Sequence, residues 1–98
     1  MAALPVELDP RAEQEARAAF LWYLERSARA AVAFESEIER AFERISEAPT
    51  TYPTIDDGLR RYLLDRFPYA LLYTIGPTLV RVVAVAHQHR RPGYGTER

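Results

Sequence analysis

The sequence predicts an α+β domain in which a helix hairpin packs on one face of a small, twisted antiparallel sheet. The main observation is that apolar residues recur at helical spacing before Pro49 and at strand-like spacing after Gly58. The second is a Gly76-Pro77 turn signal inside the strand-like part, which indicates a hairpin. The 98 residues suffice for one domain, residues 1–98, with one modest core. The predicted element order is β-α-α-β-β-β.

The first half of the chain is predicted to form a short strand and two helices. Residues 4–8 alternate between apolar and polar side chains, which is typical of an edge strand. Asp9 is a candidate N-cap, and Pro10 suits the first position of a helix over residues 10–26. Ser27 is the candidate cap of a second helix over residues 28–48. We expect the polar side of this helix to carry Glu35, Glu37, Glu39, Arg40, Glu43 and Arg44.

The second half is predicted to form the rest of the sheet. Residues 50–58 are expected to be a loop, followed by strands near 59–65, 69–75 and 79–87. Pro68 interrupts the link between the first two of these strands, so they meet through a bulge or a tight bend. Pro92-Gly93 ends the sheet, and residues 92–98 are expected to form a loose tail.

The composition excludes several classes of protein. There is no cysteine, and therefore neither a disulfide framework nor a thiolate metal site. No apolar run is long enough to cross a bilayer, and the acidic N-terminal region does not resemble a signal peptide, so we expect a cytoplasmic protein that does not bind membranes. The chain lacks a glycine-rich phosphate loop, and its two histidines fall short of a zinc ligand set, so we expect no cofactor and no metal.

Charge is divided unevenly along the chain. Residues 1–57 contain six arginines and twelve acidic residues, whereas residues 58–98 contain seven arginines and two acidic residues. The net charges are therefore −6 and +5. Such asymmetry points to a nucleic acid or an acidic protein as the partner of the basic half. The alternative is that the two halves complement each other within the fold.

One group of residues in the basic half could carry chemistry. It consists of His87, His89, Arg90 and Arg91 at the end of the last strand, with Arg60, Arg61 and Arg66 before it. Arginine binds phosphate or carboxylate through two parallel hydrogen bonds, and histidine transfers protons near neutral pH. Tyr69, Tyr73 and Tyr94 could stack on bases. The group fits RNA binding or cleavage, and it fits equally a basic sheet edge that resists aggregation or holds an acidic partner.

Several short motifs along nearly the whole chain resemble one known family. They are Trp22-Tyr23-Leu24, Ala31 and Phe34, Ile45 before Pro49, Arg60-Arg61-Tyr62, Phe67-Pro68-Tyr69, Leu72-Tyr73, Val85-Ala86-His87 and Arg90-Arg91-Pro92. With these motifs the chain resembles the RelE/ParE superfamily of toxins from bacterial type II toxin–antitoxin modules, a group that includes plasmid stabilisation proteins. The resemblance implies the fold predicted above and a cognate antitoxin bound in a hetero-oligomer.

The superfamily implies two different targets. RelE-like members cut messenger RNA on the ribosome, and here their catalytic residues would be His87, Arg61, Arg90 and Tyr94. A strand arginine usual in that branch is replaced by Ala70, which removes one group that would stabilise the transition state. The acidic helices also suit ribosomal RNA poorly.

ParE-like members poison DNA gyrase, and this is the preferred interpretation. The target or the antitoxin would then be bound by Arg60, Arg61, Arg66, Tyr73, His89 and Arg91. The ribosome-dependent endonuclease remains the first alternative. The second is a degenerate member that only binds its antitoxin.

Overall fold

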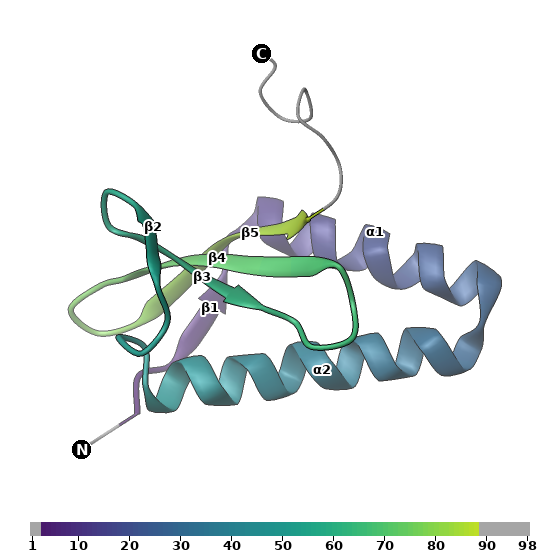
Figure 1. The fold of residues 1–98 in the computed structure, drawn as a ribbon, viewed down its shortest axis with the longest axis horizontal. Coiled ribbons are helices and arrows are strands. Elements are labelled where there is room, and N and C mark those ends of the chain that lie inside the picture. Colours follow the sequence, from purple (N-terminus) through teal and green to yellow (C-terminus); the bar gives the residue numbers. More distant parts are fainter. Residues whose placement is uncertain (1–2, 89–98) are drawn as a thin grey trace, which may run out of the picture.

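The computed structural model describes residues 3–88 as two helices packed on a five-stranded sheet (Figure 1). The helices form a hairpin that extends along the longest axis of the molecule, and the strands lie at one end of it. In chain order the elements are β1 (Val6–Leu8), α1 (Pro10–Arg26), α2 (Ala28–Glu47), β2 (Thr54–Asp56), β3 (Leu59–Leu63), β4 (Tyr69–Ile75) and β5 (Val80–His87). The α+β fold class and the helix hairpin are confirmed.

The sheet has the strand order β1-β5-β4-β3-β2 and is mixed, because β1 runs parallel to β5 while the other pairs are antiparallel. The parallel pair follows from the topology. The helix hairpin returns the chain to the start of β1, where Leu4 N–H donates to the carbonyl of Ser46 at 3.2 Å. Three hairpins then lead through β2, β3 and β4 to β5, which runs parallel to β1.

The strand β2 lies inside the stretch that was expected to be only a loop. It pairs with β3 through Thr54 and Asp56, and the connection turns at Gly58, where φ is +72°. An Asp-Gly pair is a strong hairpin signal because glycine adopts a positive φ without strain. The sequence prediction used Asp57-Gly58 only as a turn, since the three residues Thr54–Asp56, directly after Pro53, are too few for their alternation to indicate a strand.

Both helices begin at the predicted residues, but only one of the two predicted N-cap side chains makes a capping hydrogen bond. The Ser27 hydroxyl accepts a hydrogen bond from Ala30 N–H at 3.1 Å, which confirms it as the cap of α2. Asp9 occupies the N-cap position of α1 but makes no capping hydrogen bond with its side chain. Instead its backbone N–H donates to the carbonyl of Val82 at 2.9 Å, which ties the start of α1 to the sheet.

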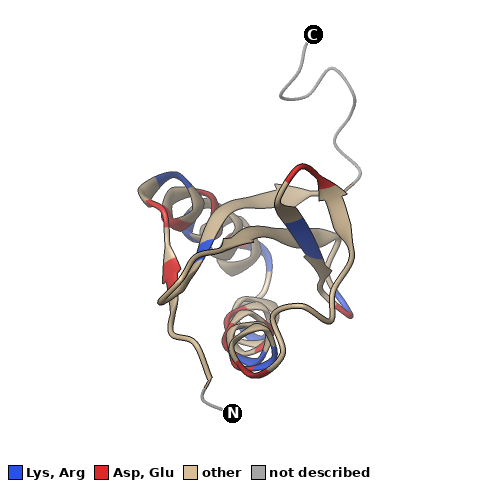
Figure 2. Cartoon of the chain, turned by 90° about the vertical axis from the view of Figure 1, so that its left-hand side faces the viewer, with Lys and Arg blue, Asp and Glu red and all other residues tan. Residues whose placement is uncertain are grey.

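The core lies between the helix hairpin and one face of the sheet (Figure 2). Successive strand residues point to opposite faces, and in β4 the residues Tyr69, Leu71 and Tyr73 point toward the helices. Phe34 of α2 is almost fully buried, and its ring lies 5.4 Å from that of Tyr69, edge to face. Aromatic rings in this arrangement add to the stabilisation from burial.

Glu37 of α2 corrects the sequence analysis, which placed it on the polar side of the helix. Only 3% of the residue is exposed. It lies three residues after Phe34 and four before Ala41, so helical geometry places it within the buried stripe. Its Oε2 accepts hydrogen bonds from the backbone N–H groups of Asp65 and Arg66. The carboxylate is therefore used to hold the turn between β3 and β4.

Neither α1 nor α2 meets the length and hydropathy that a membrane-spanning helix requires. This finding concerns residues 3–88 alone.

Candidate functional site

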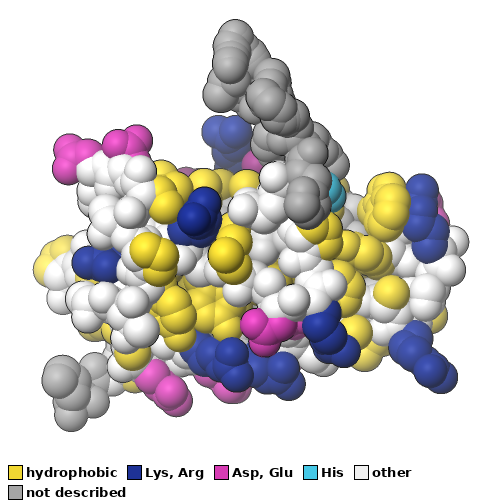
Figure 3. Space-filling view, in the orientation of Figure 1, with side chains coloured by type: hydrophobic (Ala, Val, Ile, Leu, Met, Phe, Trp, Pro, Cys, Tyr) yellow, Lys and Arg dark blue, Asp and Glu magenta, His cyan; other side chains and the backbone are white. Residues whose placement is uncertain are grey.

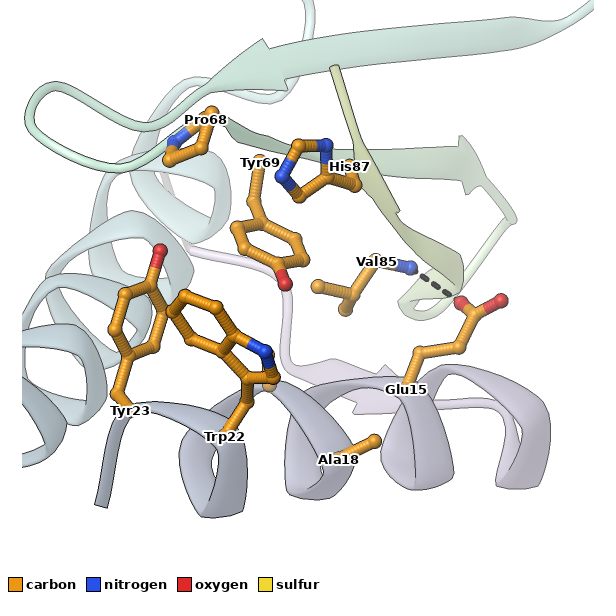
Figure 4. Close-up of a pocket in the computed structure, with 9 residues that line it drawn as sticks. Glu15, Ala18, Trp22, Tyr23, Pro68, Tyr69, Val85 and His87 are labelled. Atoms are coloured by element: carbon orange, nitrogen blue, oxygen red, sulfur yellow. Dashed lines mark hydrogen bonds between the residues drawn. The ribbon is translucent and has the colours of Figure 1, made fainter. Parts of the chain in front are cut away.

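A pocket of about 480 Å³ lies between α1 and the adjoining ends of β4 and β5 (Figure 4). It is built from two separate parts of the chain, and two residues singled out in the sequence, Tyr69 and His87, line it. The complete lining is Glu15, Ala18, Ala19, Trp22 and Tyr23 from α1, Pro68 from the turn, Tyr69 from β4, and Val85 and His87 from β5.

Four rings form a continuous series along the wall of this pocket. Trp22 contacts Tyr23 edge to face with 5.1 Å between ring centroids, and the rings of Tyr23 and Tyr69 are 6.4 Å apart. Tyr69 meets the imidazole of His87 at 4.9 Å, consistent with their direct pairing across β4 and β5. Burial, followed by the nearby Tyr69, raises the pKa of Tyr23 above its usual value, so this phenol stays neutral near pH 7.

Glu15 is the charged residue of the pocket wall, and it also holds the sheet edge. Its Oε1 accepts a hydrogen bond from the backbone N–H of Val85 at 2.7 Å, and its Oε2 lies 3.5 Å from Nε of Arg11. The partner strand β1 pairs with β5 only as far as Val82. The carboxylate thus satisfies one of the N–H groups that β1 leaves unpaired along β5.

Two of the predicted binding residues serve the fold. Tyr73 is fully buried, and its hydroxyl donates to the carbonyl of Pro49 at 2.6 Å, so its side chain offers no surface to a partner. Arg60 directs its Nη1 to the carbonyls of Tyr52 at 2.6 Å and Thr50 at 3.2 Å. These contacts hold the segment before β2 against the sheet. For Tyr73 the structure corrects the sequence prediction, because a buried aromatic side chain in mid-strand contributes to the core.

Arg61 and His87 are not brought together. Arg61 pairs with Leu72 and therefore leaves the sheet on the face opposite to Leu71 and Tyr73. His87 pairs with Tyr69 and leaves on the helix face. The two side chains that were expected to share a ribonuclease site therefore depart from opposite faces of the sheet.

Arg66 lies in the turn after β3, outside the strands that carry Arg61 and His87. It is two-thirds exposed, and its Nε is 3.6 Å from Oε1 of the buried Glu37. On the face seen in Figure 3, the arginines among residues 3–88 are spread over the surface with hydrophobic and acidic side chains between them. His89, Arg90, Arg91 and Tyr94 lie outside the described residues.

Sequence reasoning missed the helix side of the pocket. Trp22 was noticed only as part of a family motif, Tyr23 as part of that motif and of the apolar helix face, and Glu15 was not singled out. The sequence offered one signal: Trp22 is a large aromatic residue outside the apolar stripe predicted for this helix, and the structure shows it half exposed in the pocket wall. Nothing in the sequence indicates that Glu15 reaches β5, since that contact spans 70 residues along the chain.

Comparisons with known proteins agree with this architecture. The family model described as "ParE toxin of type II toxin-antitoxin system, parDE" matches residues 6–92. A solved structure entitled "Chromosomal ParDE TA system from P. aeruginosa" has a chain with a TM-score of 0.76 and 12% identity. The match covers 87% of the present chain and 96% of that chain, and at this identity it shows the fold alone. No curated protein sequence matches.

The protein therefore has two helices on a five-stranded sheet, a small α+β fold that it shares with a chain of that ParDE structure. Because the family model covers most of the sequence, the chain belongs to the ParE toxin family of type II toxin–antitoxin systems. The family resemblance inferred from the sequence is confirmed.

Proposed function

We propose that this protein is the growth-inhibiting toxin of a toxin–antitoxin pair, that a cognate antitoxin neutralises it in the cytoplasm, and that it acts on DNA gyrase without cleaving RNA. The observation that carries the last part is the separation of Arg61 from His87 across the sheet. This separation counts against the ribonuclease alternative and leaves the gyrase interpretation preferred. Plasmid stabilisation would be one consequence of such a pair.

RNA cleavage requires a proton donor or acceptor beside preorganised positive charge, because negative charge develops on the phosphate in the transition state. Among residues 3–88, no arginine lines the pocket around His87, and the pocket wall contains the Glu15 carboxylate. A carboxylate repels phosphate. Ala70, where RelE-like members have an arginine, is fully buried and adds no charge.

Gyrase as the target follows from the resemblance to ParE-like members. The end of β5 and the basic residues after it, from His87 to Arg91, are proposed to contact the target, although His89, Arg90 and Arg91 lie outside the described residues. The antitoxin is proposed to fold onto the toxin as a helix and an extended stretch. The endonuclease and the degenerate antitoxin-binding protein remain the alternatives.

The test is to express the toxin without antitoxin, to map 5′ ends of cellular transcripts, and to assay supercoiling by purified gyrase. We expect growth arrest, inhibited supercoiling and no new codon-phased transcript ends. The double variant Arg90→Ala/Arg91→Ala should relieve the inhibition. Arg11→Ala, which removes an arginine of α1 that is distant in the sequence from this region, should not. Codon-phased cleavage that is lost in His87→Ala, with supercoiling intact, would establish the endonuclease instead. Stable, folded protein with no growth defect would favour the antitoxin-binding alternative.

A further inference from the structure

A second pocket, of about 290 Å³, lies beside the outer edge of β3, away from the pocket of His87. Its wall includes the arginines Arg44 and Arg61, the ring of Tyr52, the half-exposed Leu63 and the carboxylate of Asp65. Arg44 donates a hydrogen bond to the Tyr62 hydroxyl at 3.2 Å and lies 4.0 Å from Asp65. The Tyr62 contact raises the pKa of Arg44, which keeps its charge. With two arginines and one aspartate, the pocket wall has a net positive charge.

Arg61 in this pocket has a donor that the fold does not use. Its Nε is buried, and within residues 3–88 it has no hydrogen-bond partner. Its neighbour Arg60 is the opposite case, because the Arg60 guanidinium bonds two backbone carbonyls. Buried donors without acceptors are rare and costly in folded proteins. The rest of the Arg61 side chain remains partly exposed and lines the pocket, so an acceptor entering there could meet the guanidinium.

The backbone beside this pocket is also open. The pairing of β2 with β3 ends at Arg60, and the N–H of Arg61 donates to the carbonyl of Pro53 at 3.0 Å. Strand alternation directs the N–H of Leu63 to the same side, where no strand of residues 3–88 pairs with it. An extended segment could bond to the backbone there while its side chain enters the pocket.

We propose that this pocket and the open edge at Leu63 bind an extended, acidic segment of a partner protein, with one glutamate or aspartate carboxylate held by Arg61. Arginine suits this ligand because its planar guanidinium forms paired hydrogen bonds with carboxylates. This proposal rests on the proposed function. It deepens that function because it states which kind of antitoxin segment the toxin binds: an extended one that carries an acidic side chain. A nucleic-acid phosphate is the competing ligand, and the test separates the two.

The test uses the whole chain, labelled with ¹⁵N, and two short peptides that differ only in charge: Ac-Val-Glu-Val-NH₂ and Ac-Val-Gln-Val-NH₂. NMR follows the Arg61 Nε–H and Leu63 amide signals. We expect both signals to shift saturably with the glutamate peptide, with an affinity about fivefold or more above that for the glutamine peptide. Arg61→Gln, which removes the charge, should abolish this preference. Arg81→Gln, which removes an exposed arginine elsewhere on the sheet, should retain it.

Three results would overturn the proposal: no saturable shift in the wild-type protein, equal affinity for the two peptides, or displacement of the peptide by inorganic phosphate at equal concentration. The wild-type comparison decides the matter even where a variant fails to fold. Because the measurement involves neither gyrase nor growth, its failure leaves the supercoiling result unaffected, and a negative supercoiling result leaves the peptide preference unaffected.

Discussion

Glu37 and Arg66 are joined twice, although one is buried in the helix hairpin and the other lies at the surface. The Glu37 carboxylate accepts a hydrogen bond from the Arg66 backbone N–H at 3.2 Å, and Oε1 of Glu37 lies 3.6 Å from Nε of Arg66. The same carboxylate accepts from the N–H of Asp65. A single side chain of α2 therefore fixes the turn from which β4 enters the core.

Replacing this carboxylate should be costly. We predict that Glu37→Ala lowers the free energy of unfolding by about 2–4 kcal/mol, because two partly buried hydrogen bonds from backbone N–H groups to the carboxylate would be lost. Glu37→Gln should cost less, about 1–2 kcal/mol, since the amide oxygen can still accept. Urea denaturation followed by circular dichroism measures both values.

Glu39→Ala is the matched control for this prediction, because Glu39 lies on the same helix and is exposed. It should change the stability by no more than about 0.5 kcal/mol. Equal effects of Glu37→Ala and Glu39→Ala would contradict the role given to Glu37.

The adjacent arginines of β3 should differ in their effect on stability. Arg60→Gln removes a charged donor from two backbone carbonyls and should lower the free energy of unfolding by about 1–2 kcal/mol. Arg61→Gln removes a buried donor without a partner in the described structure, so the cost should be below about 0.5 kcal/mol. Thermal and urea unfolding of both variants make the comparison. A larger loss for Arg61→Gln than for Arg60→Gln would show that these assignments are reversed.

Local sequence signals predicted the elements well because most of them depend on neighbouring residues. The change of apolar spacing located both helices, the Ser27 cap and the strands after Gly58. The parallel pairing of β1 with β5 depends instead on the three later hairpins, which set the position and direction of β5. Nothing within residues 4–8 indicates the direction of the neighbouring strand. The sheet was therefore expected to be antiparallel, whereas it is mixed.

The candidate site was predicted less well because it depends on contacts distant in sequence. Burial of Glu37 was readable from its position between Phe34 and Ala41, but its charge led to the opposite assignment. The division of Arg61 and His87 between the two faces depends on the register of both strands with β4. A one-residue shift of either register would reverse that result, and composition does not determine register.

The turn between β2 and β3 gives a prediction about the backbone. Gly58 has φ of +72°, and a Cβ added there would meet no atom within 4 Å. Any loss on substitution therefore comes from the backbone conformation and not from a clash. Gly58→Ala should lower the free energy of unfolding by about 1 kcal/mol, and Gly58→Asn by clearly less, because asparagine tolerates positive φ. Equal losses for the two variants in urea unfolding would contradict this explanation.

Tyr73 should make the protein sensitive to alkaline pH. Burial raises its pKa from 10.0 to about 12, partly opposed by the charge of Arg60. Below pH 10 the phenol is neutral in both the folded and the unfolded chain, and the protein has its full stability. As the pH rises from 10 toward 12, the unfolded chain loses this proton first, so the free energy of unfolding falls by up to about 1.4 kcal/mol per pH unit.

The variant Tyr73→Phe separates this effect from general alkaline unfolding. At neutral pH it should cost about 1 kcal/mol through loss of the hydrogen bond to the Pro49 carbonyl. Above pH 10 its stability should fall less steeply than that of the wild type, with a remaining slope from Tyr23, whose pKa burial also raises. Urea unfolding at a series of pH values gives both slopes. Parallel curves for wild type and variant would mean that Tyr73 does not couple folding to pH, because a group with a shifted pKa must contribute to the slope between its two pKa values.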